Sequence, residues 1–375
     1  MGKFVYLSYY STEQVERSVS PAAITMTKYI INALNNFNGP ITIISPAQAK
    51  GARYYAREEE FEELNQIIFL PSYYAKPKNC FLRFINRIRR KNDLKRELYR
   101  QVRDGDTLIV YHSLALMNAI KWILKRREIK LIIQVCEIYA DVINDTKERK
   151  RELNFFKLAD AYIFSSEQLE EKINSKKKKY AICLGTYQVE PDRREKFNDG
   201  KIHVVYAGTF DPRKGGAIAA AAAGEFLPEN YHIHIIGFGM ESDKKYLLDK
   251  IKTISEKSKC TVTYDGLKSG EDYIRFIQSC DIGLSTQNPD VTFNNTSFPS
   301  KVLSYMANGL RVVSIRILAV TQSSVGKYIY YYNNQTGKDL AEEILKVDIN
   351  DNYCGKEIIR NLNSKFIDNL KELLE

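Results

Sequence analysis

Short runs of β-branched residues alternate with helical segments in two separate series along this chain. In the first half such runs lie at 4–9, 41–44, 107–111, 130–135 and 160–164, and the second series begins at Ile202. Runs of this kind that alternate with helices are typical of buried parallel sheets. A polar stretch, 184–200, separates the two series. We therefore predict an α/β chain with two Rossmann-like domains that face a central cleft.

The length of 375 residues is enough for two domains that each bury a core. We expect residues 1–190 to form the first domain and residues 200–350 to form the second. The amphipathic segment 357–374 should be a helix. We expect this C-terminal helix, with about residues 356–375, to return to the first domain.

A phosphate-binding pattern lies in the stretch 297–314 of the second half. Pro299 suits the first turn of a short helix, Gly309 suits its end, and a buried strand follows from Val312. Ser297 precedes this helix start, and Ser300 and Lys301 lie within it. A helix N-terminus exposes unpaired N–H groups and favours negative charge. The pattern therefore predicts a phosphate site, placed where nucleotides usually bind in α/β sheets.

Two glycine-containing turns accompany this helix. The turn 208–216 follows a strand and contains Gly208, Thr209 and Lys214, which could bring backbone and a positive charge to a phosphate. A second strand ends in Gly237 and Phe238, where a base or ribose could pack. The alternatives are a plain turn with a solvated lysine and a tight strand-end turn. Together with the helix at 299–301, the phosphate interpretation is the better one.

The net charge of +10 is concentrated in one segment of the first half. Residues 76–103 carry 11 basic and 2 acidic side chains, with Phe81 and Phe84 among the arginines. An apolar stripe flanked by basic residues is typical of a helix that lies on a membrane surface. We expect contacts with an anionic membrane and its acceptor from Phe81, Phe84, Arg87, Arg89, Arg90 and Lys91. A solvated charged face is the alternative, and no nucleic-acid motif accompanies the charge.

Two residues of the first half are candidates for catalysis. His112 follows the strand 107–111 and could act on an acceptor hydroxyl or a donor phosphate, whereas the alternative is a histidine that only packs. Glu137 follows the strand 130–135 and could be a general base, or a plain loop glutamate. Both should lie at the carboxyl ends of strands.

The sequence predicts neither a metal site nor a membrane span. The six cysteines are scattered, the Asp-Gly-Asp at 104–106 precedes its strand, and His203, His232 and His234 look structural because they lie in or beside strands. No apolar run reaches the length of a spanning helix, and no signal peptide is visible. We expect a cytoplasmic protein with reduced thiols and no cofactor.

The second half resembles the donor domain of bacterial GT-B glycosyltransferases, in particular family 4, which builds cell-surface polysaccharides. The resemblance rests on four segments in order: YAGTFDPRKGG, HIIGFG, CDIGLSTQ and SFPSKVLSYMANGLRVVS. It implies that Lys214 contacts the diphosphate of a nucleotide sugar, without a metal. Thr209 stands where the family usually has an arginine, and Thr296 and Ser304 stand where it has two glutamates.

The resemblance and the charge distribution together suggest a function. We expect a metal-independent glycosyltransferase that moves a sugar from a nucleotide-diphosphate donor, with UDP as the first expectation, to a polyprenyl-linked glycan. It should act peripherally at the inner face of the cell membrane in polysaccharide biosynthesis, for capsule or exopolysaccharide. Two alternatives remain open: a non-catalytic GT-B subunit of another transferase, and a sugar-nucleotide epimerase or hydrolase.

Overall fold

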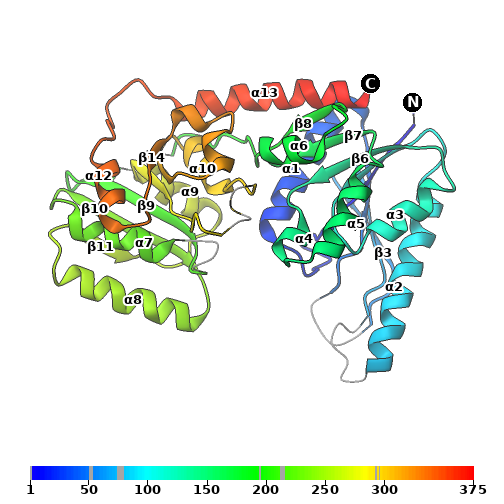
Figure 1. Cartoon of the computed structure of the whole chain (residues 1–375), viewed down its shortest axis with the longest axis horizontal. Coiled ribbons are helices and arrows are strands. Elements are labelled where there is room, and N and C mark those ends of the chain that lie inside the picture. The colour runs from blue at the N-terminus through cyan, green and yellow to red at the C-terminus, as the bar shows by residue number, and fades with distance from the viewer. Residues whose placement is uncertain are drawn as a thin grey trace. The chain divides into compact units, whose positions relative to one another are not determined.

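The computed structural model describes residues 2–49, 54–73, 80–193, 196–211, 216–291, 294 and 296–375 (Figure 1). The chain divides into two compact units, each with its own sheet. The first unit comprises Met1–Ser165, Leu169–Cys183 and Phe366–Glu375, and the second comprises Ser166–Gln168 and Leu184–Lys365. The predicted α/β class with two Rossmann-like domains is confirmed.

The first unit is built on an eight-stranded sheet in the order β3-β4-β2-β1-β5-β6-β7-β8. All neighbouring strands run parallel except β3 and β4, which are antiparallel. Its central strands are buried almost throughout because helices cover both faces of a parallel sheet. The strands are β1 (Phe4–Leu7), β2 (Thr42–Ser45), β3 (Glu58–Glu62), β4 (Asn65–Phe69), β5 (Thr107–Tyr111), β6 (Lys130–Val135), β7 (Ala161–Phe164) and β8 (Tyr180–Ile182).

The helices of the first unit alternate with its strands along most of the chain. They are α1 (Pro21–Asn38), α2 (Cys80–Gln101), α3 (Met117–Leu124), α4 (Tyr139–Val142), α5 (Thr146–Phe156) and α6 (Glu167–Ile173), the start of which belongs to the second unit. The side chain of Asp145 caps α5 by accepting hydrogen bonds from the backbone N–H groups of Lys147 and Glu148.

The second unit has a six-stranded parallel sheet in the order β11-β10-β9-β12-β13-β14. Its strands are β9 (Ile202–Thr209), β10 (Tyr231–Phe238), β11 (Thr261–Tyr264), β12 (Ile282–Ser285), β13 (Arg311–Ile315) and β14 (Tyr330–Tyr332). Its helices are α7 (Ala217–Ala222), η1 (Ala223–Phe226), α8 (Glu241–Ser255), α9 (Gly270–Ser279), α10 (Ser300–Ala307), α11 (Leu318–Thr321), η3 (Gly326–Tyr328) and α12 (Gly337–Ile344).

The last helix, α13 (Gly355–Leu374), is shared between the units, because its residues from Phe366 onward count with the first. There the Phe366 ring stacks on Tyr29 with 5.5 Å between centroids, and Lys179 Nζ donates to the Glu372 carbonyl at 3.0 Å. The predicted return of the C-terminal helix is confirmed. The division itself falls at Cys183 rather than near 190, and at Phe366 rather than near 356. Among the described residues, no helix is both long enough and apolar enough to cross a bilayer.

Candidate functional site

Two glycines lie side by side at the carboxyl ends of β9 and β10. Gly208 and Gly237 are register partners, and Gly237 has a φ of +140° that side chains rarely tolerate. A Cβ at Gly237 would lie 1.8 Å from the Gly208 carbonyl oxygen, and a Cβ at Gly208 would lie 2.8 Å from Lys301 Nζ. The predicted residues Gly208, Gly237 and Lys301 are therefore brought together at one edge of the sheet.

Lys301 reaches this edge from the first turn of α10. Its Nζ lies 4.0 Å from the centre of the Tyr206 ring, and burial lowers the pKa of Lys301 to about 7. Among the described residues, no carboxylate forms an ion pair with it. A poorly solvated ammonium without a counter-charge favours an anionic ligand.

Tyr206 also holds both described ends of the turn between β9 and α7. Its hydroxyl donates to the Thr209 carbonyl at 2.8 Å and accepts from the Gly216 N–H at 3.0 Å. The Thr209 side chain accepts from the Asp211 N–H at 3.1 Å. Lys214, predicted to contact a diphosphate, lies outside the described residues.

The helix α10 begins at Ser300, one residue later than predicted, with Pro299 in the N-cap position. It ends as predicted: Gly309 has a φ of +86°, and the Leu310 N–H donates to the Tyr305 carbonyl at 3.0 Å. Tyr305 was missed by sequence reasoning. Its buried hydroxyl accepts from the Ala207 N–H at 2.8 Å, which ties α10 to β9.

The predicted residues beside α10 are placed differently from one another. Ser300 is exposed and Ser297 is half-buried, whereas Thr296 is buried and its carbonyl accepts from Ser166 Oγ at 2.7 Å. The Ser304 hydroxyl lies 3.1 Å from the Tyr273 hydroxyl on α9. The Ser304 hydroxyl therefore already has a hydrogen-bonding partner within the second unit.

Phe238, the last residue of β10, was predicted to pack against a base or ribose. Its side chain is 61% exposed, and Met240 just beyond it is 69% exposed. Two exposed apolar side chains next to Gly237 form a surface on which a flat ring could stack.

In the first unit, His112 lies in the core rather than on the surface. Its side chain is 1% exposed, and its ring lies among Phe155, Phe156 and Tyr139. Its Nε2–H donates to Glu152 Oε1 at 2.6 Å. This burial favours the packing alternative for His112, because a group acting on an acceptor must reach it.

The carboxylate of Glu152 is the centre of this buried network and was missed by sequence reasoning. It is fully buried and also accepts from the backbone N–H groups of Tyr139 and Ala140, each at 2.9 Å. The carboxylate therefore satisfies the N–H groups at the start of α4 and fixes the loop after β6. Glu137 lies in that loop and is half-buried, at the carboxyl end of β6 as predicted.

Arg17, in the loop after β1, is a second charged group inside the first unit. Its side chain is 1% exposed and lies against the rings of Tyr55 and Phe69, at 5.7 and 5.3 Å from their centres. Within the described ranges, its guanidinium nitrogens make no hydrogen bond, and the nearest carboxylate oxygen, on Glu58, lies 3.8 Å away. Burial lowers the pKa of Arg17.

Comparison with known proteins identifies the fold. No protein-family model matches the sequence, and no curated protein matches it. Solved structures do: the trehalose-6-phosphate enzyme of E. coli bound with UDP-2-fluoro glucose aligns with a TM-score of 0.71 and 11% identity, covering 100% of this chain and 98% of that one. The chain has the GT-B fold.

Two further structures support this GT-B assignment. The α,α-trehalose 6-phosphate synthase of Burkholderia multivorans aligns with a TM-score of 0.71 and 11% identity, over 100% of this chain and 95% of that one. A UDP-forming synthase of Burkholderia xenovorans, in complex with glucose-6-phosphate, aligns at 0.67 and 10% identity over 100% of both chains. At such identities the likeness concerns the fold and carries no residue roles.

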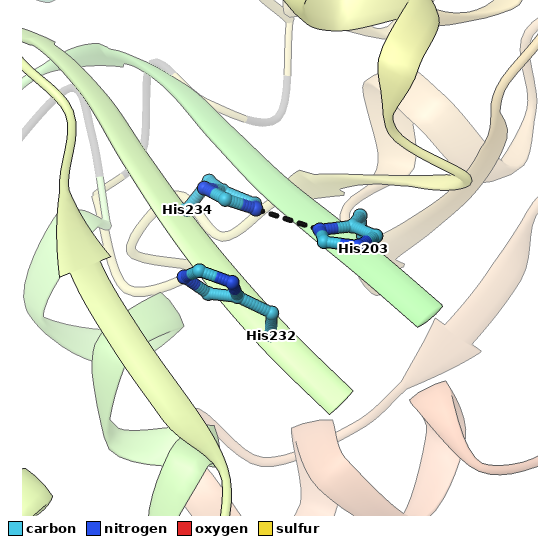
Figure 2. A group of neighbouring side chains, drawn as sticks. All are labelled: His203, His232 and His234. Carbon is cyan, nitrogen blue, oxygen red and sulfur yellow. Dashed lines mark hydrogen bonds between the residues drawn. The ribbon is translucent and has the colours of Figure 1, made fainter. Parts of the chain in front are cut away.

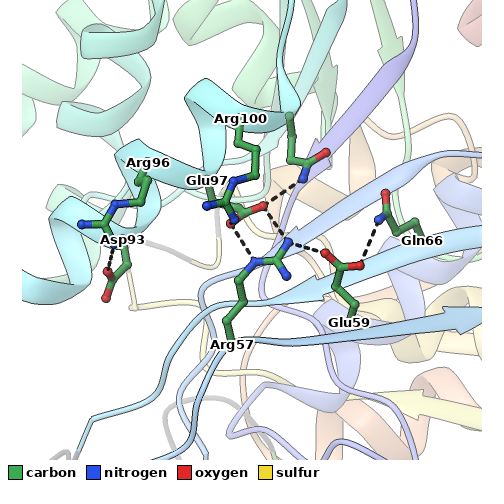
Figure 3. Close-up of polar contacts among 8 residues, drawn as sticks. Arg57, Glu59, Gln66, Asp93, Arg96, Glu97 and Arg100 are labelled. Carbon is green, nitrogen blue, oxygen red and sulfur yellow. Dashed lines mark hydrogen bonds and ion pairs between the residues drawn. The ribbon is translucent and has the colours of Figure 1, made fainter.

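Most of the basic segment predicted to contact a membrane lies in α2, and its first residues, 76–79, lie outside the described residues. A buried Glu97 holds the second half of this helix to the segment before β3, because Arg57 bonds it twice, at 2.8 and 2.9 Å (Figure 3). The first half of the helix is largely exposed. Phe81 is 65% exposed and Phe84 60%. The basic residues of this half are exposed at Arg87, Arg89 and Lys91 and half-buried at Arg90.

The three histidines that the sequence suggested to be structural lie close together, with ring nitrogens near enough to hold a metal ion. One ring nitrogen from each of His203, His232 and His234 lies within 4.8 Å of the other two (Figure 2). Sequence reasoning saw three separate strand histidines. The parallel pairing of β9 with β10 brings them onto one face.

Proposed function

We propose that the protein is a glycosyltransferase whose second unit binds a nucleotide-diphosphate sugar. The observation that carries the proposal is the group formed by Gly208, Gly237 and Lys301 at the carboxyl ends of β9 and β10. Ligands of open α/β sheets bind at such ends, and an unpaired, poorly solvated ammonium there suits a diphosphate. Solved structures of the same fold are described as UDP-forming, which supports UDP as the nucleotide.

The chemistry asked of this group is stabilisation of the departing diphosphate. Negative charge grows on the diphosphate as the bond to the sugar breaks, and a positive group already in place lowers the barrier. Lys301 and the first-turn N–H groups of α10 would supply this, together with Lys214. Phe238 would pack against the nucleoside. The mechanism needs no metal ion at the donor.

For the acceptor we propose that Glu137 contacts the hydroxyl that attacks the sugar. Glu137 lies in a loop at the carboxyl end of β6, and the Glu152 network fixes the start of α4 that follows. His112 would act through Glu152, as a positioning residue, and not on the acceptor itself.

We propose a lipid-linked glycan as the acceptor, and the inner face of the cell membrane as the place of action. Support comes from the first half of α2, where exposed Phe81 and Phe84 accompany basic side chains. The sequence resemblance to family 4 supports a role in surface polysaccharide synthesis.

A sugar phosphate is a second candidate acceptor. The observation that favours it is Arg17, a buried guanidinium whose nitrogens make no hydrogen bond within the described ranges. A phosphate would supply the missing acceptors. One solved structure of the same fold was determined with glucose-6-phosphate.

The test is a panel of UDP-, GDP- and dTDP-sugars, first by thermal shift and then by transfer of labelled sugar. We expect one donor to raise the unfolding temperature and label to appear in the lipid fraction of a membrane extract. Label in a soluble sugar phosphate would support the second acceptor. Donor breakdown or epimerisation without acceptor would favour an epimerase or hydrolase. If no transfer or breakdown of the donor is detected until a partner protein is added, a non-catalytic subunit would be favoured.

A further inference from the structure

Three of the four histidines of the sequence gather at the amino ends of β9 and β10 (Figure 2). His203 is the register partner of His232, and His234 follows two residues later on the same face of β10. The rings of His232 and His234 stack with 3.8 Å between centroids. This end of the sheet is opposite to the one that carries Gly208 and Gly237.

Carboxylates occupy the outer nitrogens of two of these rings. His203 Nε2 lies 2.9 Å from Asp199 Oδ1, and His234 Nδ1 lies 3.1 Å from Asp265 Oδ2. An ionised carboxylate can only accept, so each of these nitrogens carries a hydrogen.

The inner nitrogens of the same two rings face each other. His203 Nδ1 and His234 Nε2 are 2.9 Å apart. With both outer nitrogens protonated, two neutral rings would place lone pair against lone pair. The contact therefore needs a cation between the rings: either an extra proton, which makes one ring an imidazolium, or a metal ion.

The third ring also presents a free lone pair. His232 Nε2 lies 2.9 Å from Thr263 Oγ1, and that hydroxyl donates its one hydrogen to Asp265 Oδ2 at 2.9 Å. The hydroxyl must therefore accept from His232 Nε2–H, which leaves Nδ1 of His232 unprotonated.

We propose that His203, His232 and His234 bind one divalent transition-metal ion of the zinc class through their three unprotonated nitrogens. Neutral imidazole is the ligand that zinc, copper and nickel share. The carboxylates of Asp199 and Asp265 would orient two of the ligands, as metal-bound histidines in proteins usually require.

The geometry needs only small adjustments. Tetrahedral zinc with bonds of about 2.0–2.1 Å places neighbouring nitrogens about 3.3 Å apart. The pair at 2.9 Å opens by a few tenths of an ångström, and nitrogens up to 4.8 Å away close by up to about 1.5 Å. The fourth position remains for water.

The surroundings disfavour the extra proton and suit a metal. Phe197 stacks on His203 at 4.1 Å, and Phe276 lies edge-on to His234 at 5.2 Å. His232 is only half-buried, which gives an ion a way in.

The ion would be structural. Through Asp199, Thr263 and Asp265 it would connect the segment that leads into β9 with β10 and β11. Because it lies at the amino ends of the strands, it would not touch the donor.

The test is zinc titration of the full-length protein after chelator treatment and removal of the chelator. We expect one zinc per chain by calorimetry and elemental analysis, with a higher unfolding temperature. His232→Gln and His234→Gln should each weaken binding at least tenfold. His112→Gln is the matched control, because it removes the only other histidine of the sequence and should leave zinc affinity unchanged.

Cobalt spectroscopy distinguishes histidine ligands from cysteine ligands. If cysteines held the metal, the cobalt-loaded protein would show sulfur-to-metal charge transfer, which overturns the proposal. Absence of saturable zinc binding by the folded protein also overturns it. Should His234→Gln fail to fold, the half-buried His232→Gln decides alone: unchanged affinity in that variant refutes the site.

Discussion

The state of charge of Lys301 should control donor binding. Burial lowers its pKa from 10.5 to about 7, so the side chain is about 90% charged at pH 6 and about 10% charged at pH 8. Only the ammonium attracts a diphosphate. The apparent affinity for a UDP-sugar should therefore fall about tenfold between pH 6 and pH 8, which corresponds to about 1.4 kcal/mol.

The assay is calorimetric titration of UDP-glucose, or of the sugar nucleotide that the panel identifies, at several pH values. A sugar nucleotide carries no phosphate proton that titrates in this range. Lys301→Arg is the control, since arginine stays charged and its affinity profile should be flat. Lys301→Met should weaken binding at pH 6 by about 1.5–3 kcal/mol, the usual contribution of a charged hydrogen bond. A wild-type affinity that does not change with pH would refute the reasoning.

The charge on Lys301 that should strengthen donor binding should also lower the stability of the donor-free folded protein. Its pKa is lower in the folded than in the unfolded protein, so folding must displace a proton between pH 7 and 10.5 and must bury the charge below pH 7. Lys301→Met should therefore raise the unfolding temperature of the donor-free protein. The gain should be largest below pH 7 and should shrink as the pH rises toward 10.5. If Lys301→Met instead lowered the unfolding temperature, the buried charge of Lys301 would not be destabilising and the reasoning would be wrong.

Further substitutions test the rest of the structure. Gly237→Ala should cost at least about 1–3 kcal/mol of unfolding free energy, from its φ and the clash with the Gly208 carbonyl, whereas Gly39→Ala, strained but without neighbours, should cost less in urea unfolding. Glu152→Ala should cost about 3 kcal/mol or more because it leaves three buried donors unpaired, and Glu148→Ala on the same helix should cost less than about 1 kcal/mol. Replacing the four basic residues 87, 89, 90 and 91 on α2 by glutamine should reduce co-sedimentation with anionic vesicles. The matched control replaces the four lysines 244, 245, 250 and 252 on α8 and should leave co-sedimentation unchanged. If both variants lose binding equally, net charge alone explains the binding and α2 is not a membrane-contacting surface.

Most of the strands that sequence reasoning found are central and largely buried, as in 107–111 and 130–135, where the predicted and observed bounds coincide. The strands it missed lie toward the edges of the sheets. β3 (Glu58–Glu62) has the sequence EEEFE. Its residues alternate between half-buried and exposed, but they do not alternate between apolar and polar, so the sequence gives no strand signal.

The grouping of Gly208, Gly237 and Lys301 at the carboxyl ends of β9 and β10 could be predicted because its signals are local. Glycines after a strand and a proline before a short helix reveal themselves within ten residues. The buried groups could not be predicted in this way: Glu152 meets His112 across 40 residues, and Tyr305 meets Ala207 across 98. Whether a polar side chain lies inside or outside depends on such partners. The histidine cluster shows the same limit, since His203 and His232 become neighbours only through strand pairing.

The sharing of α13 has a consequence for synthesis on the ribosome. The first unit buries Phe366, Leu370 and Leu373 from this helix, yet these residues are made only after the whole of the second unit. The part of the chain that emerges first is therefore completed last. Until α13 has been made, the apolar surface of the first unit around Tyr29 on α1, which Phe366 covers in the folded protein, remains exposed to solvent.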